Sequence, residues 1–92
     1  MQITYDKNFG GDLLIRFGED VGFTEVERLL TRDWFAKEIY RIGTFDQGWL
    51  DLQIDKGNLC LHWDATAGLC LISRDSAGEQ VLRRIGESLS AT

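Results

Sequence analysis

The sequence predicts an α+β fold: a single antiparallel sheet of five or six strands with two helices packed on one face, in the order β-β-α-β-β-β-β-α. Two segments, residues 24–36 and 76–89, carry apolar side chains at helical spacing and predict the helices. Residues 38–74 instead alternate with a period of two between short turns, which is typical of an antiparallel meander. With 92 residues, of which 43% are hydrophobic, the chain is expected to form one domain over residues 1–92.

The N-terminal region predicts two strands followed by the first helix. Residues 1–6 (MQITYD) alternate weakly, and residues 12–17 (DLLIRF) carry an apolar run that predicts a strand buried on both faces. In the helix, Thr24 and Glu27 have the spacing of a capping box, in which each side chain bonds the backbone N–H of the other residue. The apolar stripe of this helix consists of Phe23, Val26, Leu29, Leu30 and Trp34.

The meander and the last helix complete the predicted order. The four strand segments are EIYRIGTF, WLDLQID, NLCLHWD and LCLISRD, separated by the turns DQG, KG and ATAG. Ser76 and Glu79 have a second capping-box spacing. The buried stripe of the last helix consists of Val81, Leu82, Ile85 and Leu89. Gly86 costs this helix about 1 kcal/mol relative to alanine, which indicates a close approach to the sheet.

The hairpin turns predict which side chains share a face of the sheet. A two-residue loop at Lys56-Gly57 is expected in one hairpin, and a loop from Asp64 to Gly68 with a positive φ at Gly68 in the next. The paired residues are then Ile54 with Leu59, Leu52 with Leu61, Leu50 with Trp63, Leu69 with Trp63 and Leu71 with Leu61. Because this register places all eight apolar side chains on one face, we expect the helices to cover that face.

The opposite face of the sheet is the unusual surface of this chain. Its candidate interaction residues are Trp49, Asp51, Cys60, His62, Cys70 and Ile72. In the expected register Asp51 lies across from His62. An exposed aromatic and apolar face on a small acidic domain typically marks a binding surface, and Phe45 is a further candidate anchor for it.

Two other kinds of site remain open at the same residues. A zinc site could use Cys60, His62 and Cys70 with Asp51 or Asp64 as fourth ligand, although the spacing matches no common zinc motif. A small enzyme could use a cysteine nucleophile with His62 and Asp51, although a flat sheet face offers neither a pocket nor an oxyanion hole. A disulfide between Cys60 and Cys70 is disfavoured because the two lie diagonally. We therefore predict no catalytic residue, metal or cofactor.

Composition and charge disfavour several classes of partner. The net charge is −5 and the longest basic run is Arg83-Arg84, so nucleic acid and anionic membrane surfaces are unfavourable partners. The N-terminus lacks the features of a signal peptide, and no apolar run approaches the length of a membrane span. Two cysteines are too few for a disulfide scaffold, so we expect reduced thiols in the cytoplasm.

The segment GWLDLQIDKGNLCLHWDATAGLCLISRD, with the closing helix, resembles a family of short uncharacterised bacterial proteins, a domain of unknown function. The resemblance covers Trp49 to Leu89. It rests on a tryptophan-led strand, a strand ending in an aromatic and an acidic residue, a cysteine-containing strand and a helix. It implies a bacterial cytoplasmic setting, and it implies no activity and no site residues.

These observations favour a small non-enzymatic cytoplasmic protein that binds another protein, or itself, through the open sheet face. The alternative is a metal- or small-ligand-binding domain centred on Cys60, His62 and Cys70. A small enzyme that uses cysteine and histidine ranks third.

Overall fold

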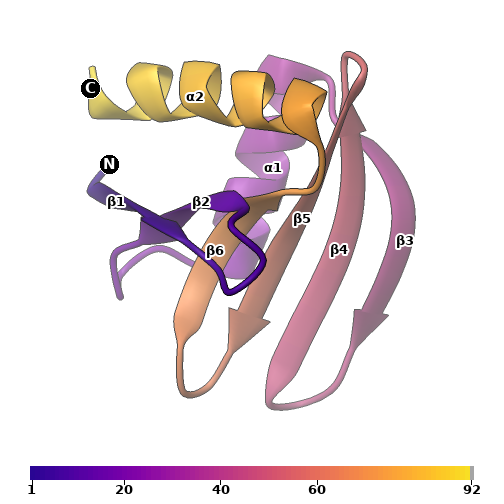
Figure 1. The fold of residues 1–92 in the computed structure, drawn as a ribbon. Coiled ribbons are helices and arrows are strands. Elements are labelled where there is room, and N and C mark those ends of the chain that lie inside the picture. The colour runs from indigo at the N-terminus through magenta and orange to yellow at the C-terminus, as the bar shows by residue number, and fades with distance from the viewer. Residues whose placement is uncertain (92) are drawn as a thin grey trace.

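The computed structural model describes residues 1–91 and has the predicted order of elements in one six-stranded antiparallel sheet (Figure 1). The elements are β1 (Ile3–Lys7), β2 (Leu13–Phe17), α1 (Phe23–Trp34), β3 (Lys37–Gly43), β4 (Gln47–Ile54), β5 (Gly57–Asp64), β6 (Gly68–Ser73) and α2 (Ser76–Ser90). The strands lie in the order β1-β2-β6-β5-β4-β3, so β1 and β3 form the two edges of the sheet. Within residues 1–91, no helix combines the length and apolar composition needed to cross a membrane.

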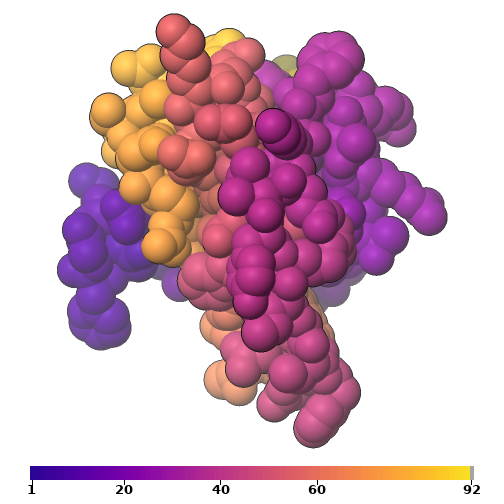
Figure 2. Space-filling model, turned by 90° about the vertical axis from the view of Figure 1, so that its right-hand side faces the viewer, coloured from indigo at the N-terminus to yellow at the C-terminus, as the bar shows by residue number. Residues whose placement is uncertain are grey.

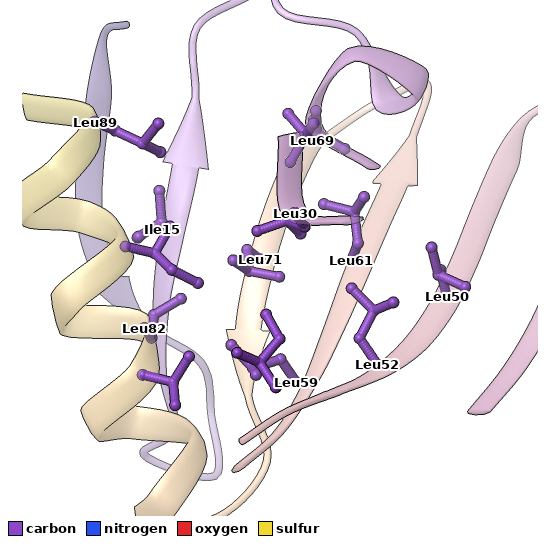
Figure 3. Close-up of a cluster of buried hydrophobic side chains, with 14 of the residues drawn as sticks. Ile15, Leu30, Leu50, Leu52, Leu59, Leu61, Leu69, Leu71, Leu82 and Leu89 are labelled. Atoms are coloured by element: carbon purple, nitrogen blue, oxygen red, sulfur yellow. The ribbon is translucent and has the colours of Figure 1, made fainter. Parts of the chain in front are cut away.

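Both helices pack on the same face of the sheet and form one hydrophobic core with it (Figure 3). The core joins alternate residues of the strands to one stripe of each helix, as the two periodicities predict. Its members are Leu13, Ile15, Val26, Leu30, Leu50, Leu52, Ile54, Leu59, Leu61, Leu69, Leu71, Val81, Leu82, Ile85 and Leu89. Trp63, which is expected on this face, packs at its margin and is only half-buried.

The predicted register between β4 and β5 is wrong by two residues. The hairpin loop is Asp55-Lys56, with Asp55 in the left-handed region (φ 55°), and Ile54 pairs with Gly57. The central pairs are therefore Leu52 with Leu59 and Leu50 with Leu61. Because side chains alternate with a period of two, the shift changes the cross-strand partners and leaves every side chain on its predicted face.

Gly57 is not part of the hairpin loop, contrary to the expectation, but lies where β5 packs closely against α2. A Cβ on Gly57 would lie 2.7 Å from the Cα of Gly78 in the first turn of α2. A Cβ on Gly78 would lie 2.2 Å from the carbonyl oxygen of Asn58. Both distances are far inside van der Waals contact, so the two glycines let the backbones of β5 and α2 touch.

The other predicted contacts of the sheet are confirmed. β5 and β6 have the expected register, and Gly68 takes the expected positive φ of 81°. The β2 residues Leu13 and Leu14 point to opposite faces and are both buried. Gly86 of α2 does approach the sheet closely, because a Cβ there would lie 1.8 Å from the hydroxyl oxygen of Tyr5 on β1.

The capping box predicted for α1 does not form. The helix begins at Phe23 after an extended Gly22, and no side chain caps it. Glu27, the expected partner of Thr24, instead binds the guanidinium group of Arg41 on β3. The carboxylate gains a charge-assisted hydrogen bond from the neighbouring strand in place of a local one.

The capping box predicted for α2 is replaced by a cap one residue earlier. Asp75 accepts a hydrogen bond from the N–H of Gly78 at 2.7 Å, so Ser76 is the first helical residue and not the cap. The same carboxylate accepts hydrogen bonds from the backbone and side chain of Asn58 on β5, at 3.2 and 2.7 Å. These bonds from Gly78 and Asn58 lower the pKa of Asp75 and tie the start of α2 to β5.

Replacing Gly78 with alanine is expected to destabilise the protein by about 2–3 kcal/mol, although alanine is the better helix former by about 1 kcal/mol. The new Cβ would clash with the Asn58 carbonyl group, which belongs to a strand backbone and cannot rotate aside. Free energies of unfolding from chemical denaturation measure the effect. Gly10→Ala is the control, because its Cβ would meet other atoms only at 3.5 Å or beyond, and it should change stability by less than about 0.5 kcal/mol. A more stable Gly78→Ala protein would contradict the backbone contact.

Candidate functional site

The sheet face turned away from the helices, here called the open face, carries all six predicted interaction residues. They are Trp49 and Asp51 of β4, Cys60 and His62 of β5, and Cys70 and Ile72 of β6. The pairing of β2 with β6 extends this face on one side with Leu14 and Arg16. The pairing of β3 with β4 extends it on the other side with Tyr40 and Ile42.

The middle of the open face is covered by its own side chains. Cys60 is 0% exposed and Cys70 is 8% exposed, and Leu14 is buried as well. None of these three belongs to the core beneath the helices. Ile72 pairs with Leu14 on one side and Cys60 on the other, so these residues form a second, small apolar cluster. Cys60 and Cys70, predicted as interaction residues, thus lie inside the protein and cannot touch a partner directly.

Trp49 is held on the open face by three neighbours. Its ring meets that of His62 edge to face, with centroids 5.1 Å apart and an interplanar angle of 69°. Its indole N–H donates a hydrogen bond to Asp51 at 3.0 Å, and the guanidinium group of Arg74 lies 5.8 Å from its ring centroid. The expected pairing of Asp51 with His62 is wrong, because the two-residue shift places Trp49 across from His62 and Asp51 across from Cys60.

Both thiols lie in surroundings that favour the protonated form. Burial raises the pKa of Cys60 to about 12, and the Asp51 carboxylate across from it adds to the rise. Burial also raises the pKa of Cys70. A cysteine nucleophile or zinc ligand acts as a thiolate, which these surroundings disfavour. Among residues 1–91 both cysteines are free, and no three His, Cys, Asp or Glu side chains are grouped so as to hold a metal ion.

The exposed apolar side chains at one edge of the sheet gather on and beside β3. Ile39, Tyr40 and Ile42 are each 55% exposed, and Phe45 in the β3–β4 turn is 96% exposed. We call these four residues the β3 patch, and Figure 2 shows the side of the molecule on which β3 and this turn lie. Ile42 pairs with Trp49 of β4, so the β3 patch is continuous with the open face.

Phe45 and Trp49 are expected from the sequence as anchors, whereas Ile39, Tyr40 and Ile42 are not. The sequence did contain a signal for two of these residues: Tyr40 and Ile42 are two positions apart in a predicted strand, so they are expected to share a face. Their exposure depends on the position of β3 at the edge of the sheet, which the alternation does not specify.

The charged side chains of β3 are compensated on the face that the helices cover. Arg41 binds Glu27 of α1 and Glu38 of its own strand, the latter at 2.7 Å. The hydrogen bonds that the guanidinium group donates to Glu27 and to Glu38 raise its pKa further. The register shifts by one residue between Glu38 and Tyr40, which marks a β-bulge at Ile39. From Tyr40 to Ile42 the strand is therefore apolar on the open face and charge-balanced on the other, whereas Lys37, across from Gln53, lies on the open face.

A hollow of about 440 Å³ lies between the β2–α1 loop and the β5–β6 turn. Asp64, one of its two carboxylates, accepts hydrogen bonds from the backbone N–H groups of Ala67 and Thr66. These bonds lower the pKa of Asp64 and use the carboxylate to close the turn. The other carboxylate, Glu19, is exposed on a loop, so the residues that line this hollow form no pair poised for acid–base chemistry.

Comparison of this chain with models of protein families, with curated proteins and with solved structures found no match. The resemblance of the segment from Trp49 to Leu89 to a bacterial family therefore stays a prediction.

The stability of the protein is expected to fall at alkaline pH because of Cys60. Its folded-state pKa of about 12 lies above the unfolded value of about 8.5, so unfolding releases a proton as the pH rises between them. The stability that the thiol contributes is complete below about pH 8.5 and decreases above it, by about 1–2 kcal/mol at pH 10. Denaturation of wild type and Cys60→Ala at pH 8 and pH 10 measures the loss, because the variant lacks this proton. If the difference in free energy of unfolding between wild type and Cys60→Ala is the same at pH 8 and pH 10, the burial of the thiol is contradicted.

Ile72→Glu is expected to destabilise the protein by about 2–4 kcal/mol, because the carboxylate would lie between buried Leu14 and buried Cys60. Ile42→Glu, on the exposed edge strand, should cost about 1 kcal/mol or less. The two free energies of unfolding are compared by chemical denaturation. Equal stabilities would show that the middle of the open face is not covered as described.

Proposed function

We propose that this protein is a non-enzymatic binding module that contacts a protein partner through the β3 patch and the adjoining Trp49. The observation that carries the proposal is the gathering of Ile39, Tyr40, Ile42 and Phe45 at one edge of the sheet, each more than half exposed. Exposed apolar surface costs about 25 cal/mol per Å², and a partner that covers a contiguous patch relieves this cost.

The side chains of this surface are those that protein interfaces favour. Aromatic residues contribute large contact areas: Trp49 lies across from the β-branched Ile42, Tyr40 is two positions before it on the same strand, and Phe45 follows in the turn. Trp49 is already held by its ring contact with His62 and by its hydrogen bond. It would therefore lose little side-chain freedom on binding, and that loss is one of the main costs of association.

The surroundings of the thiols support a binding role over chemistry. A metal site or an enzyme centred on Cys60, His62 and Cys70 needs a thiolate, and burial raises the pKa of both thiols. The imidazole of His62 is packed against Trp49. We therefore rank the ligand-binding and enzymatic alternatives below a binding module. The free thiols of Cys60 and Cys70 support a reducing compartment such as the bacterial cytoplasm.

Immobilised wild-type protein is expected to retain a protein partner, either from a lysate of the native host or as purified protein, and Ile42→Glu should lose it. A carboxylate buried in an interface without a counter-charge lowers affinity by about 100-fold or more. Retained protein is quantified by mass spectrometry, and circular dichroism confirms that each variant is folded.

Phe9→Glu is the matched control for Ile42→Glu. Phe9 is likewise an exposed apolar residue, but it lies in the turn between β1 and β2, at the other edge of the sheet. The Phe9→Glu protein should retain as much partner as the wild type. Equal retention by wild type and Ile42→Glu would contradict the proposed surface.

A further inference from the structure

We infer that the partner at the β3 edge is a second copy of this chain, whose β3 pairs antiparallel with the first about a two-fold axis at Arg41. The inference rests on the proposed function, because it names the occupant of the same surface. Three features of the strand carry it: outward-directed backbone groups, self-complementary apolar side chains, and opposite charges at its two ends.

The backbone of β3 directs hydrogen-bonding groups outward at alternate residues. Thr44, next to the turn, donates its N–H to a carbonyl oxygen of β4 at 2.8 Å. Hydrogen-bonded pairs alternate along an antiparallel ladder, so Ile42 and Tyr40 also bond to β4. Gly43 and Arg41, which alternate with them, therefore direct their N–H and C=O groups away from the sheet. These are the groups to which a further strand would bond.

A partner strand centred on Arg41 makes the exposed apolar side chains complementary. In this register Tyr40 of each copy lies across from Ile42 of the other, so the same contact forms twice. Pairs of an aromatic and a β-branched side chain are among the favourable cross-strand combinations. Each copy carries the bulge between Glu38 and Tyr40, which interrupts regular pairing at both ends of the shared segment, so the contact depends mainly on these two pairs.

The charges of β3 permit this approach although each copy carries a net charge of −5. Arg41, which meets its counterpart at the axis, is already compensated by Glu27 and Glu38. Within residues 1–91, Lys37 at the start of β3 and Asp46 in the turn after it form no ion pair. Antiparallel pairing brings Lys37 of each copy to the Asp46 end of the other, which creates two contacts between opposite charges.

Sedimentation velocity of the full chain, from about 1 µM to about 500 µM, tests the inference. The wild type is expected to convert from monomer to dimer over this range. Ile42→Glu should weaken the dimer by about 100-fold or more while staying folded by circular dichroism, and Phe9→Glu should associate like the wild type. Lys37→Glu and Asp46→Lys should each weaken the dimer, and the double variant should restore it because opposite charges again face each other.

Disulfide trapping tests the register independently. The Cα atoms of paired Tyr40 and Ile42 would lie about 4.5 Å apart, within the range that a disulfide spans. An equimolar mixture of Tyr40→Cys and Ile42→Cys should therefore form a mixed dimer under mild oxidation, and neither variant alone should cross-link as efficiently. The native Cys60 and Cys70 are buried and compete little.

Wild-type protein that stays monomeric over the whole range, or a dimer that Ile42→Glu leaves intact, overturns the inference. A dimer in which the charge swap restores nothing, or in which the mixed disulfide does not form, overturns the register at Arg41. If the protein is monomeric but retains a host protein that Ile42→Glu loses, the inference that the partner is a second copy is overturned, while the proposed function is supported. A monomer that retains no partner contradicts both.

Discussion

The contact between the backbones of β5 and α2 is the constraint on which the rest of the structure depends. Gly57 and Gly78 lack the side chains that would hold the helix away from the strand. Asp75 closes the junction, because its carboxylate accepts hydrogen bonds from both Gly78 and Asn58. With the first turn placed in this way, the apolar stripe of α2 that includes Leu82 lies on the sheet, and the buried residues form one continuous core.

Because both helices pack on one face, no helix or strand within residues 1–91 covers the other face, and its own side chains cover it. The small thiols of Cys60 and Cys70 are buried there, with Cys60 across from Ile72 and Cys70 across from His62. Cysteine behaves there as a small hydrophobic residue. Burial of the two thiols raises their pKa values and so disfavours the thiolate that a cysteine nucleophile or a zinc ligand requires.

This self-covering ends at β3, which has a neighbouring strand on one side only. Edge strands usually resist further pairing through charges and bulges. β3 has a bulge at Ile39 and a charge at Lys37, but Tyr40 and Ile42 on its open face are unprotected. Arg41 on the other face is compensated within the monomer. The unprotected apolar segment of this edge is therefore short, from Tyr40 to Ile42, and the proposed pairing depends on it.

The periodicity of the sequence was enough to predict the order of the elements and the faces on which the residues of β4, β5 and β6 lie. In β3 the bulge at Ile39 places Glu38 and Tyr40 on opposite faces, which the alternation does not predict. Side-chain direction is a local property of a helix or strand, so even a register error of two residues left the faces intact. Only the tertiary structure decided the β4–β5 register, the helix caps, the burial of Cys60 and the exposure of Ile42. Each of these depends on which distant segments meet, as when Gly57 meets Gly78 or Glu27 meets Arg41, and on which strand is left at the edge of the sheet.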